Sequence, residues 1–368
     1  MFSKVILLSL FFILDVLAQE PLYLAENIID ELSSLPSTEN SQACLCVPYW
    51  QCKDDFSGLL DDEADLIDVR FLKESPENGT SCSGDFDVCC KLECGRSNRD
   101  LRFRSIRKQN KRLDFRILGD NNDAEFGEFP WMLGILEQRV YRCGASLIHP
   151  QVALTAAHCV SPNKKYKIRA GEWNWESQSE PLPHQDRWSA KIIVHPQYNN
   201  RSLKNDIALI ITDTPFKIGQ NVGIICLPQS VTNYDPENCI ASGWGKNSVQ
   251  KGSYQSTLKK VQLPIVNSIE CTEKLRNARL GPYFNLHKSF ICAGGYANKD
   301  TCKGDGGGPL ICATKGATDR YQQVGIVSWG LTCGLKNTPG VYTNVGLFVE
   351  WIDSQMGRNN FDSTVYKL

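Results

Sequence analysis

Between residues 117 and 357, short apolar runs alternate with turns rich in Gly, Pro and Asn. The runs include PWMLGIL, GASLIHPQVALTAAH, KIIVHP, IALIIT, YQQVGIVSWG and GVYTNV. Many short strands separated by regular turns predict an all-β barrel or sandwich. Near the end of this region, GLFVEWIDSQM places apolar residues at helical spacing, which predicts one helix before a C-terminal tail of residues 358–368.

The first residues follow a different pattern, with Lys4 ahead of an apolar run that ends near Ala18. A short basic start, an apolar stretch and a small residue predict a signal peptide over residues 1–18. The alternative, an N-terminal membrane anchor, is disfavoured because the run is too short to span a bilayer. Residues 19–43 are polar and acidic and predict an N-terminal extension, and no later segment predicts a membrane span.

Six cysteines crowd into residues 44–90. A module of this size cannot bury much apolar surface, so it needs covalent staples. Within it, the alternating stretch LIDVRFL predicts a strand. Residues 44–90 are therefore interpreted as a small disulfide-rich domain.

A basic linker, residues 91–116, separates this module from the β-rich region. Nine of the 22 residues between 95 and 116 are Lys or Arg. Such a run is typical of a solvated linker, and it is also what a trypsin-like protease cuts. The sequence favours a processing site here, but a plain linker needs the same properties.

Composition narrows the class of protein. A net charge of −1 gives no indication of nucleic-acid or membrane-surface binding. The 16 cysteines form an even number in a chain with an export signal, which predicts eight disulfides in an oxidising compartment. Two sequons, at Asn78 and Asn200, predict glycosylation in a secreted protein.

Three short motifs carry the chemistry: LTAAHC with His158, NDIALI with Asp206, and GDGGGP with Gly306. Each motif alone is weak, but together with GWG, VSWG and PGVYT they are specific. On these residues, the region 117–357 resembles a chymotrypsin-like serine protease domain, which implies a double β-barrel. Residues 44–94 resemble the clip domain that precedes such domains in arthropod haemolymph proteins. The chain as a whole resembles the clip-domain serine protease homologues of the prophenoloxidase-activating-factor type.

The nucleophile that this resemblance requires is absent. A protease of this type needs a hydroxyl to attack the scissile carbonyl, an imidazole to take its proton, and a carboxylate to orient the imidazole. His158 and Asp206 match the last two roles, but Gly306 has no side chain and cannot form an acyl-enzyme. No serine lies within ten residues of Gly306, and Thr301 is no substitute. Losing such a nucleophile costs about 10⁶ in kcat in a protease where it was measured, so no functional catalytic residue is expected.

The resemblance implies that other parts of the machinery remain. It places Gly304 and Gly306 at the oxyanion positions. It assigns the specificity pocket to Asp300, Ser328, Trp329, Gly330 and Gly340. Such a pocket would hold Arg or Lys through charge-assisted hydrogen bonds. The favoured interpretation is that the carboxylate at its base is a relic without a ligand, and that His158 and Asp206 are a retained structural hydrogen-bonded pair rather than catalysts.

The resemblance also places an activation junction at Arg116–Ile117. A new amino terminus at Ile117 would pair with Asp305 and order the pocket. The segment ILGD departs from the usual pattern, because Asp120 stands where a second glycine is typical. The activating cut is therefore open between this junction and other sites in the clip or linker.

A full set of disulfides follows from the resemblance. The clip pairs would be Cys44–Cys89, Cys46–Cys82 and Cys52–Cys90. The remaining pairs would be Cys94–Cys226, Cys143–Cys159, Cys239–Cys312, Cys271–Cys292 and Cys302–Cys333. The pair Cys94–Cys226 would keep the clip domain attached after a cut in the linker.

The loop GEWNWESQSEPLPHQDRW lies where some relatives bind calcium. Glu172, Asn174 and Asp186 offer oxygen ligands of the kind that calcium takes. An ordinary solvated acidic loop explains the same residues equally well, so no cofactor is required and structural calcium stays an open alternative.

The expected function follows from the missing nucleophile and from the resemblance. We expect a secreted, non-catalytic haemolymph protein that an upstream clip-domain serine protease cuts. The cut form would act as a cofactor or scaffold for prophenoloxidase activation in melanization and innate immunity, with possible homo-oligomers. One alternative is an adhesion or pattern-recognition protein that binds microbial or haemocyte surfaces. A weak protease with an unexpected nucleophile is the least favoured reading.

Overall fold

The computed structural model describes residues 93–97 and 122–368, with gaps at 178, 230–232, 247–252, 298 and 318. It also describes two short strands, Cys44–Pro48 (β1) and Asp87–Lys91 (β2). These two strands pair antiparallel, with Cys46 opposite Cys89. The expected signal peptide, the N-terminal extension, the LIDVRFL strand and Asn78 lie outside the described residues.

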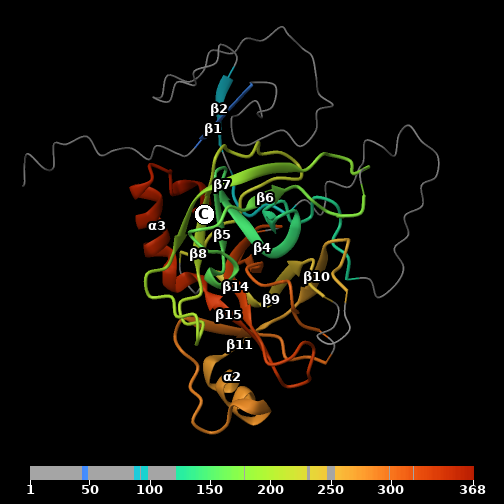
Figure 1. Cartoon of the computed structure of the whole chain (residues 1–368), viewed down its shortest axis with the longest axis vertical. Coiled ribbons are helices and arrows are strands. Elements are labelled where there is room, and N and C mark those ends of the chain that lie inside the picture. The colour runs from blue at the N-terminus through green and yellow to red at the C-terminus, as the bar shows by residue number, and fades with distance from the viewer. Residues whose placement is uncertain are drawn as a thin grey trace, which may run out of the picture. The chain divides into compact units, whose positions relative to one another are not determined.

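The first half of the β-rich region forms a closed barrel (Figure 1). Its strands follow one another around the barrel in the order β3-β4-β5-β8-β7-β6. Their bounds are Met132–Glu137 (β3), Val140–His149 (β4), Val152–Thr155 (β5), Lys167–Ala170 (β6), Gln185–Val194 (β7) and Ala208–Thr212 (β8). Both β5 and β8 are buried along their whole length, as expected for VALT and ALIIT runs without a polar face.

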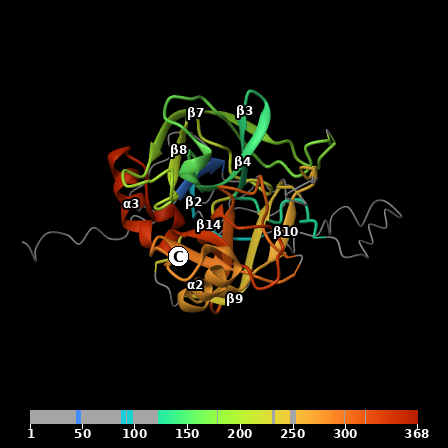
Figure 2. The same ribbon diagram turned by 60° about the horizontal axis from the view of Figure 1, so that its bottom comes forward.

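The second half forms a seven-stranded antiparallel sheet in the order β10-β9-β13-β14-β15-β12-β11. Its strands are Tyr234–Gly243 (β9), Lys259–Gln262 (β10), Ile265–Val266 (β11), Phe290–Ala293 (β12), Pro309–Thr314 (β13), Tyr321–Trp329 (β14) and Gly340–Asn344 (β15). Figure 2 shows β9 and β10 below the strands β3, β4, β7 and β8 of the closed barrel. The expected all-β fold with two barrel-type sheets is confirmed.

Helices are few in the described part of the chain. The expected C-terminal helix is α3, Val349–Arg358, which buries Ile352 and Met356. A second helix, Ser268–Leu275 (α2), was not predicted and continues into a π-turn over Arg276–Leu280. The segment NSIE indicates the start of this helix in the sequence. The Asn267 side chain accepts a hydrogen bond from the Glu270 amide and caps the first turn.

The last ten residues pack onto the closed barrel. Tyr366 is fully buried, and its carbonyl accepts the Leu227 amide. The Phe361 ring lies 4.8 Å from the His149 ring. Residues 358–368, expected as a tail, therefore belong to the folded domain.

The start of the expected linker is also held on the domain. Gly95 donates its amide to Ile224 and accepts the Tyr321 amide. It has φ +74°, and an added Cβ there would meet the Tyr321 carbonyl. Ser97 donates its hydroxyl to the Glu128 carbonyl over 2.9 Å. Residues 94–97, expected as part of the linker, are thus docked on the domain.

Five disulfides lie in the described part of the chain. They are Cys94–Cys226, Cys143–Cys159, Cys239–Cys312, Cys271–Cys292 and Cys302–Cys333. These are the pairs that the resemblance implies for this region. Of the clip cysteines, Cys90 is disulfide-bonded, while Cys52 and Cys82 lie outside the described residues, so the three clip pairs stay predictions.

Candidate functional site

The site lies where the closed barrel meets the seven-stranded sheet. His158 sits in a single 3-10 turn, Ala157–Cys159, directly after β5, and Asp206 precedes β8. The His158 ring nitrogen Nδ1 lies 2.7 Å from Asp206 Oδ2, and the His158 amide donates to Asp206 Oδ1 over 2.9 Å. Because a carboxylate accepts only, Nδ1 carries the proton and Nε2 is the ring atom left for other partners.

Asp206 is 0% exposed and fully satisfied. Besides His158, it accepts the Ser328 hydroxyl at Oδ2 over 2.6 Å. Its backbone carbonyl accepts the Thr343 hydroxyl over 2.8 Å. The imidazole is therefore held by a buried carboxylate that strands β14 and β15 fix in place.

Gly306 faces His158 from the loop before β13. A Cβ built on Gly306 would lie 2.8 Å from His158 Nε2, closer than real contacts allow. The Gly306 carbonyl accepts the Gly144 amide of β4 over 2.9 Å, which fixes the loop against the closed barrel. The histidine ring thus reaches into the space that a nucleophile side chain would fill.

The loop around Gly306 is ordered by its neighbours. Gly304 has φ +104°, and its carbonyl accepts the Tyr141 hydroxyl over 3.0 Å. Tyr254 packs on its other side, where an added Cβ would lie 2.5 Å from the ring. In the part of the chain that the structure describes, the amides of Gly304 and Gly306 donate to no acceptor. The sequence analysis missed both tyrosines, because nothing in their local sequence ties them to this loop.

Asp305 is buried between two glycines of the GWG motif. It accepts the Gly245 amide over 2.7 Å and the Cys302 amide over 2.8 Å. An added Cβ at Gly243 or Gly245 would collide with this carboxylate. Burial raises the pKa of Asp305 above its ordinary value. The expected partner of this carboxylate, Ile117, lies outside the described residues.

Among the expected pocket residues, Asp300 and Gly340 lie side by side. The Asp300 carboxylate accepts the Thr301 amide over 2.9 Å and the Gly334 amide over 3.1 Å. Gly340 lies beside it, since an added Cβ there would be 3.1 Å from Asp300 Oδ1. Burial raises the pKa of Asp300 to about 6, although the two amides lower it in part. No described cation pairs with this carboxylate.

Three further residues expected in the pocket follow one another where β14 ends. Ser328, which donates to Asp206, leads through Trp329 to Gly330 at the end of β14. A Cβ built on Gly330 would meet only the Thr332 carbonyl, at 4.0 Å, so the space beside it is open. Trp329 is held by edge-on contacts with Phe284 and Phe290.

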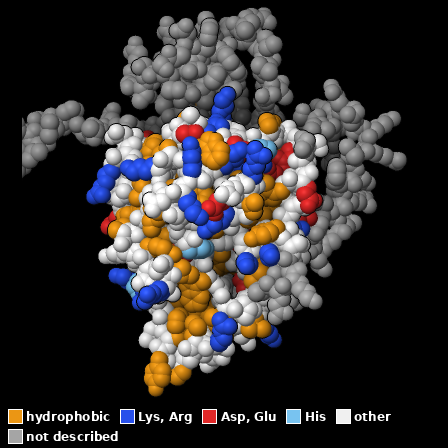
Figure 3. Space-filling model, in the orientation of Figure 1, with side chains coloured by type: hydrophobic (Ala, Val, Ile, Leu, Met, Phe, Trp, Pro, Cys, Tyr) orange, Lys and Arg blue, Asp and Glu red, His pale blue; other side chains and the backbone are white. Residues whose placement is uncertain are grey.

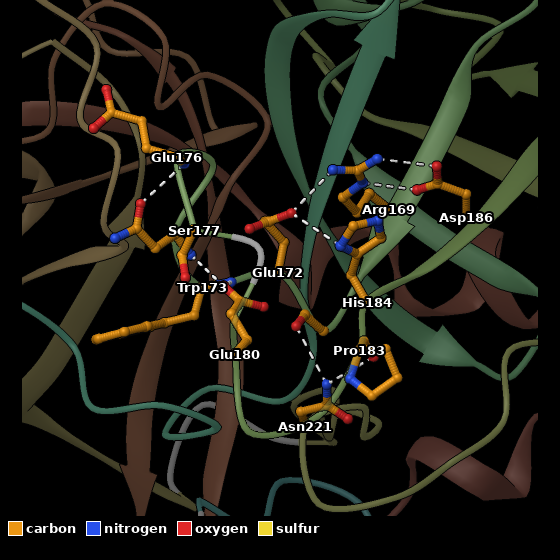
Figure 4. A network of polar contacts seen from close by, with 12 residues as sticks. Arg169, Glu172, Trp173, Glu176, Ser177, Glu180, Pro183, His184, Asp186 and Asn221 are labelled. Atoms are coloured by element: carbon orange, nitrogen blue, oxygen red, sulfur yellow. Dashed lines mark hydrogen bonds and ion pairs between the residues drawn. The ribbon is translucent and has the colours of Figure 1, made fainter.

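The acidic loop after β6 is arranged around an arginine (Figure 4). Arg169 forms a two-bond ion pair with Asp186, at 2.7 and 3.0 Å, and a third bond to Glu172 at 3.0 Å. His184 lies 3.4 Å from the same Glu172 carboxylate. Arg169 thus pairs with two of the three expected calcium ligands.

The third expected calcium ligand points elsewhere. The Asn174 side chain accepts the Glu176 amide over 3.0 Å. The carboxylate that neighbours Glu172 is instead Glu180, which the sequence analysis missed. Burial, and then the charge of Glu172, raise the pKa of Glu180. Structural calcium at Glu172, Asn174 and Asp186 stays a prediction.

One further cluster of ligand-type atoms exists among the described residues, formed by Cys143, His158 and Cys159. Its two cysteines are joined in a disulfide and offer no thiolates. Asn200 is exposed on a surface turn, as a glycosylated asparagine requires.

Side chains of different types are unevenly distributed over the face shown in Figure 3. Hydrophobic side chains gather toward the α2 end of this face. Ile269 is 74% exposed and Tyr283 is 93% exposed in this region. No described helix is both long and apolar enough to cross a membrane.

Fold and site together define a serine-protease-type domain in which Gly306 faces a hydrogen-bonded His158–Asp206 pair. A family model described as Trypsin matches residues 119–352, and one described as Serine protease Clip domain PPAF-2 matches residues 34–91. The chain therefore belongs to the trypsin family and carries an amino-terminal clip domain.

Named relatives agree with this assignment. Phenoloxidase-activating factor 2 of Galleria mellonella is 45% identical over 69% of this chain and 89% of its own length. The inactive CLIP domain-containing serine protease A3 of Aedes aegypti is 36% identical over 86% of this chain and 68% of its own length. The inactive CLIP domain-containing serine protease A28 of Anopheles gambiae is 39% identical over 64% of each chain.

Proposed function

We propose that the chain is a secreted, catalytically inactive clip-domain protease homologue that assists prophenoloxidase activation. The observation that carries the proposal is Gly306 beside an intact His158–Asp206 pair. A fold that keeps the buried acid and the imidazole, but offers no hydroxyl, supports binding rather than hydrolysis. Relatives named phenoloxidase-activating factor or inactive protease support the same role.

Cleavage in the basic linker would produce the active form. Residues 94–97 are docked by hydrogen bonds and by Cys94–Cys226, so the cuttable stretch is residues 98–116. An upstream clip-domain protease would cut there, and the disulfide would retain the clip domain. The cut form would then act as a scaffold for prophenoloxidase, alone or as a homo-oligomer.

Reconstitution tests this proposal. Purified protein would be incubated with prophenoloxidase and its activating protease, with and without prior cleavage of residues 98–116, and phenoloxidase activity followed. A matched control replaces every Lys and Arg in 98–116 by Gln, leaving the docked Arg96 in place. We expect the cut wild type to raise phenoloxidase activity while an arginyl ester remains unhydrolysed, and the control to raise nothing.

The opposite result would contradict the proposed cofactor role. If cleavage makes no difference and phenoloxidase activity does not rise, the cofactor role fails. Binding of the uncut protein to microbial or haemocyte surfaces would then support the adhesion role instead.

A further inference from the structure

An exposed tryptophan lies beside two lysines on the closed barrel. Trp188 of β7 is 44% exposed, whereas the next residue, Ser189, is buried. Because side chains alternate along a strand, Trp188 points out of the barrel. The Lys165 and Lys167 ammonium groups each lie 5.4 Å from the centre of its ring, and Lys167 pairs directly opposite Trp188 in the sheet. These three side chains form one surface, the Trp188 patch.

The cations of this patch are not fully neutralised by carboxylates. Asp186 is shared by Lys167, at 3.0 Å, and by Arg169, at 2.7 Å. Asp213 accepts the Trp188 amide over 3.2 Å and is therefore engaged with the backbone of this strand. Lys165 forms no ion pair with a carboxylate in the described part of the chain. Its ammonium group is held over an aromatic ring and can still pair with an added anion.

A second group of cations adjoins the patch. Glu137, at the end of β3, is shared by Arg142, at 2.5 Å, and by Lys164, at 2.6 Å. Lys164 directly precedes Lys165 in the sequence. Figure 3 shows Lys and Arg side chains, with hydrophobic atoms between them, on the part of this face where Figure 1 places β6 and β7. In each group two cations share one carboxylate, and the surplus positive charge attracts anions.

A ligand of this patch must satisfy an aromatic face and two ammonium groups at once. The face of an indole ring is electron-rich and stacks on the weakly positive C–H groups of a flat partner. Each ammonium group donates charge-assisted hydrogen bonds to anionic oxygens. Because both lysines adjoin one ring, the unit that stacks on Trp188 needs two anionic groups. A sugar ring with several sulfate groups meets this requirement, whereas a uronic acid ring carries a single carboxylate.

The position of these strands disfavours an extended peptide as the ligand. Strand β6 is hydrogen-bonded to β3 on one side and to β7 on the other, and β7 also pairs with β8. Both strands belong to the closed barrel, so neither offers a free edge to which a peptide could add as a further strand. The patch therefore presents side chains only, which suits a ligand recognised by stacking and charge.

We propose that the Trp188 patch binds a sulfated polysaccharide. One sugar ring stacks on Trp188, and its sulfate oxygens accept hydrogen bonds from the Lys165 and Lys167 ammonium groups. The cations around Glu137 meet the sulfate groups of a neighbouring sugar. The site uses no residue of the loop around Gly306. The inference goes beyond the cofactor role and does not depend on it, because polysaccharide binding is measured without prophenoloxidase.

The test measures binding to a heparin octasaccharide, to hyaluronan of equal length and to a linear polyphosphate, at about 0.15 M salt. Heparin carries sulfated rings, hyaluronan carries carboxylates without sulfate, and polyphosphate carries charge without rings. The protein is the full chain with every Lys and Arg in 98–116 replaced by Gln, so that the basic linker does not bind the probes. We expect heparin to bind at least about tenfold more tightly than hyaluronan, because its sulfate groups reach both lysines.

Variants separate stacking from charge. Trp188→Ala should weaken heparin binding about fivefold and polyphosphate binding less than about twofold, because polyphosphate has no ring to stack. Trp188→Phe should restore most of the heparin affinity. Lys165→Gln should weaken the binding of both probes and lower the salt dependence of heparin binding by about one released ion. The matched control Lys288→Gln removes an exposed lysine outside the patch and should change neither affinity.

Thermal unfolding checks that each variant is folded. The proposal is wrong if heparin binds no more tightly than hyaluronan, or if the folded Trp188→Ala and Lys165→Gln variants bind heparin as tightly as the unsubstituted patch. It is also wrong if Trp188→Ala weakens polyphosphate binding as much as heparin binding, since the patch would then recognise charge alone. Polyglutamate that binds as tightly as heparin, with the same dependence on Trp188, would assign the patch to an acidic peptide instead.

Discussion

At the scale of single residues, Gly306 provides no nucleophile, and the groups around it also leave little room for one. The His158 ring occupies the approach to this position, with Nε2 2.8 Å from an added Cβ. Asp305, the residue before Gly306, is held by hydrogen bonds from the Gly245 and Cys302 amides. Returning one hydroxyl to the loop therefore does not by itself return a protease.

The variant Gly306→Ser tests this statement. We expect the uncut variant to resist labelling by a fluorophosphonate, because the imidazole must first move out of the space that the new side chain needs. Gly306→Ala meets the same crowding, and we expect both variants to lose about 1–3 kcal/mol of unfolding free energy in urea. Rapid labelling of the uncut Gly306→Ser chain would show that the site is preformed for catalysis.

The pH dependence of ligand binding reports on Asp300. Burial raises its pKa to about 6, with Asp305 adding a smaller upward effect, and the Tyr342 hydroxyl lies on the same side, bonded to Thr301. A cationic ligand needs the ionised form, which is lost as the pH falls through 6. We expect the affinity for p-aminobenzamidine to drop up to about tenfold per pH unit below this value.

Two controls complete this measurement. Asp300→Asn should bind weakly with no such pH profile. Because the raised pKa disfavours the charged form in the fold, Asp300 also contributes increasing stability to the wild type as the pH falls from 7 toward 4. A flat binding profile between pH 8 and pH 5 would contradict the role of this carboxylate.

At the scale of elements, strand β6 and the acidic loop after it depend on one arginine. Arg169 contacts Asp186 and Glu172, and its guanidinium lies 5.3 Å from the centre of the Trp175 ring. Glu172 is 6% exposed, so its charge needs a partner within the fold. Arg169 supplies positive charge to both carboxylates, Glu172 and Asp186.

The variant Arg169→Met tests whether Arg169 and calcium compete for the same carboxylates. We expect the variant to lose about 3 kcal/mol of unfolding free energy, because it removes the guanidinium from the buried Glu172 carboxylate. We also expect calcium to raise the melting temperature of the variant more than that of the wild type. Equal stabilisation of both proteins would place calcium at oxygen ligands that do not compete with Arg169.

At the scale of the whole molecule, attachment of the linker decides what cleavage can do. Five hydrogen bonds hold residues 94–97: Gly95 with Ile224 and Tyr321, Ser97 with Asp319 and Glu128, and Cys94 with Arg320. At about 1 kcal/mol each, these bonds correspond to a dissociation constant of about 0.2 mM. At micromolar concentration the disulfide Cys94–Cys226 is the attachment that matters.

Size-exclusion chromatography tests this at micromolar concentration. After cleavage in 98–116, we expect the wild type to elute as one particle and to separate into two chains only under reduction. The double variant Cys94→Ser/Cys226→Ser, cut in the same way, should elute as two separate species. Co-elution of its fragments would reveal further contacts between the clip-bearing fragment and the barrels.

The sequence by itself determined the strands, the C-terminal helix and the missing nucleophile. Alternating or continuous apolar runs are local signals, and each encodes which face of a strand is buried. The identity of residue 306 is read directly, and its consequence follows from bond chemistry alone. The resemblance to a known family supplied the disulfide pairs of the barrels, which spacing alone could not.

Tertiary structure alone decided how charges and rings pair across the fold. Tyr141 and Tyr254 reach the loop of Gly304 from distant segments, and Arg169 pairs with the carboxylates of Glu172 and Asp186. Residues 358–368, predicted as a tail, also belong to the folded domain, because Tyr366 is buried. Such contacts depend on which side chains the two sheets bring together. The pattern of residues along the chain carries no information about the distance between side chains that are far apart in the sequence.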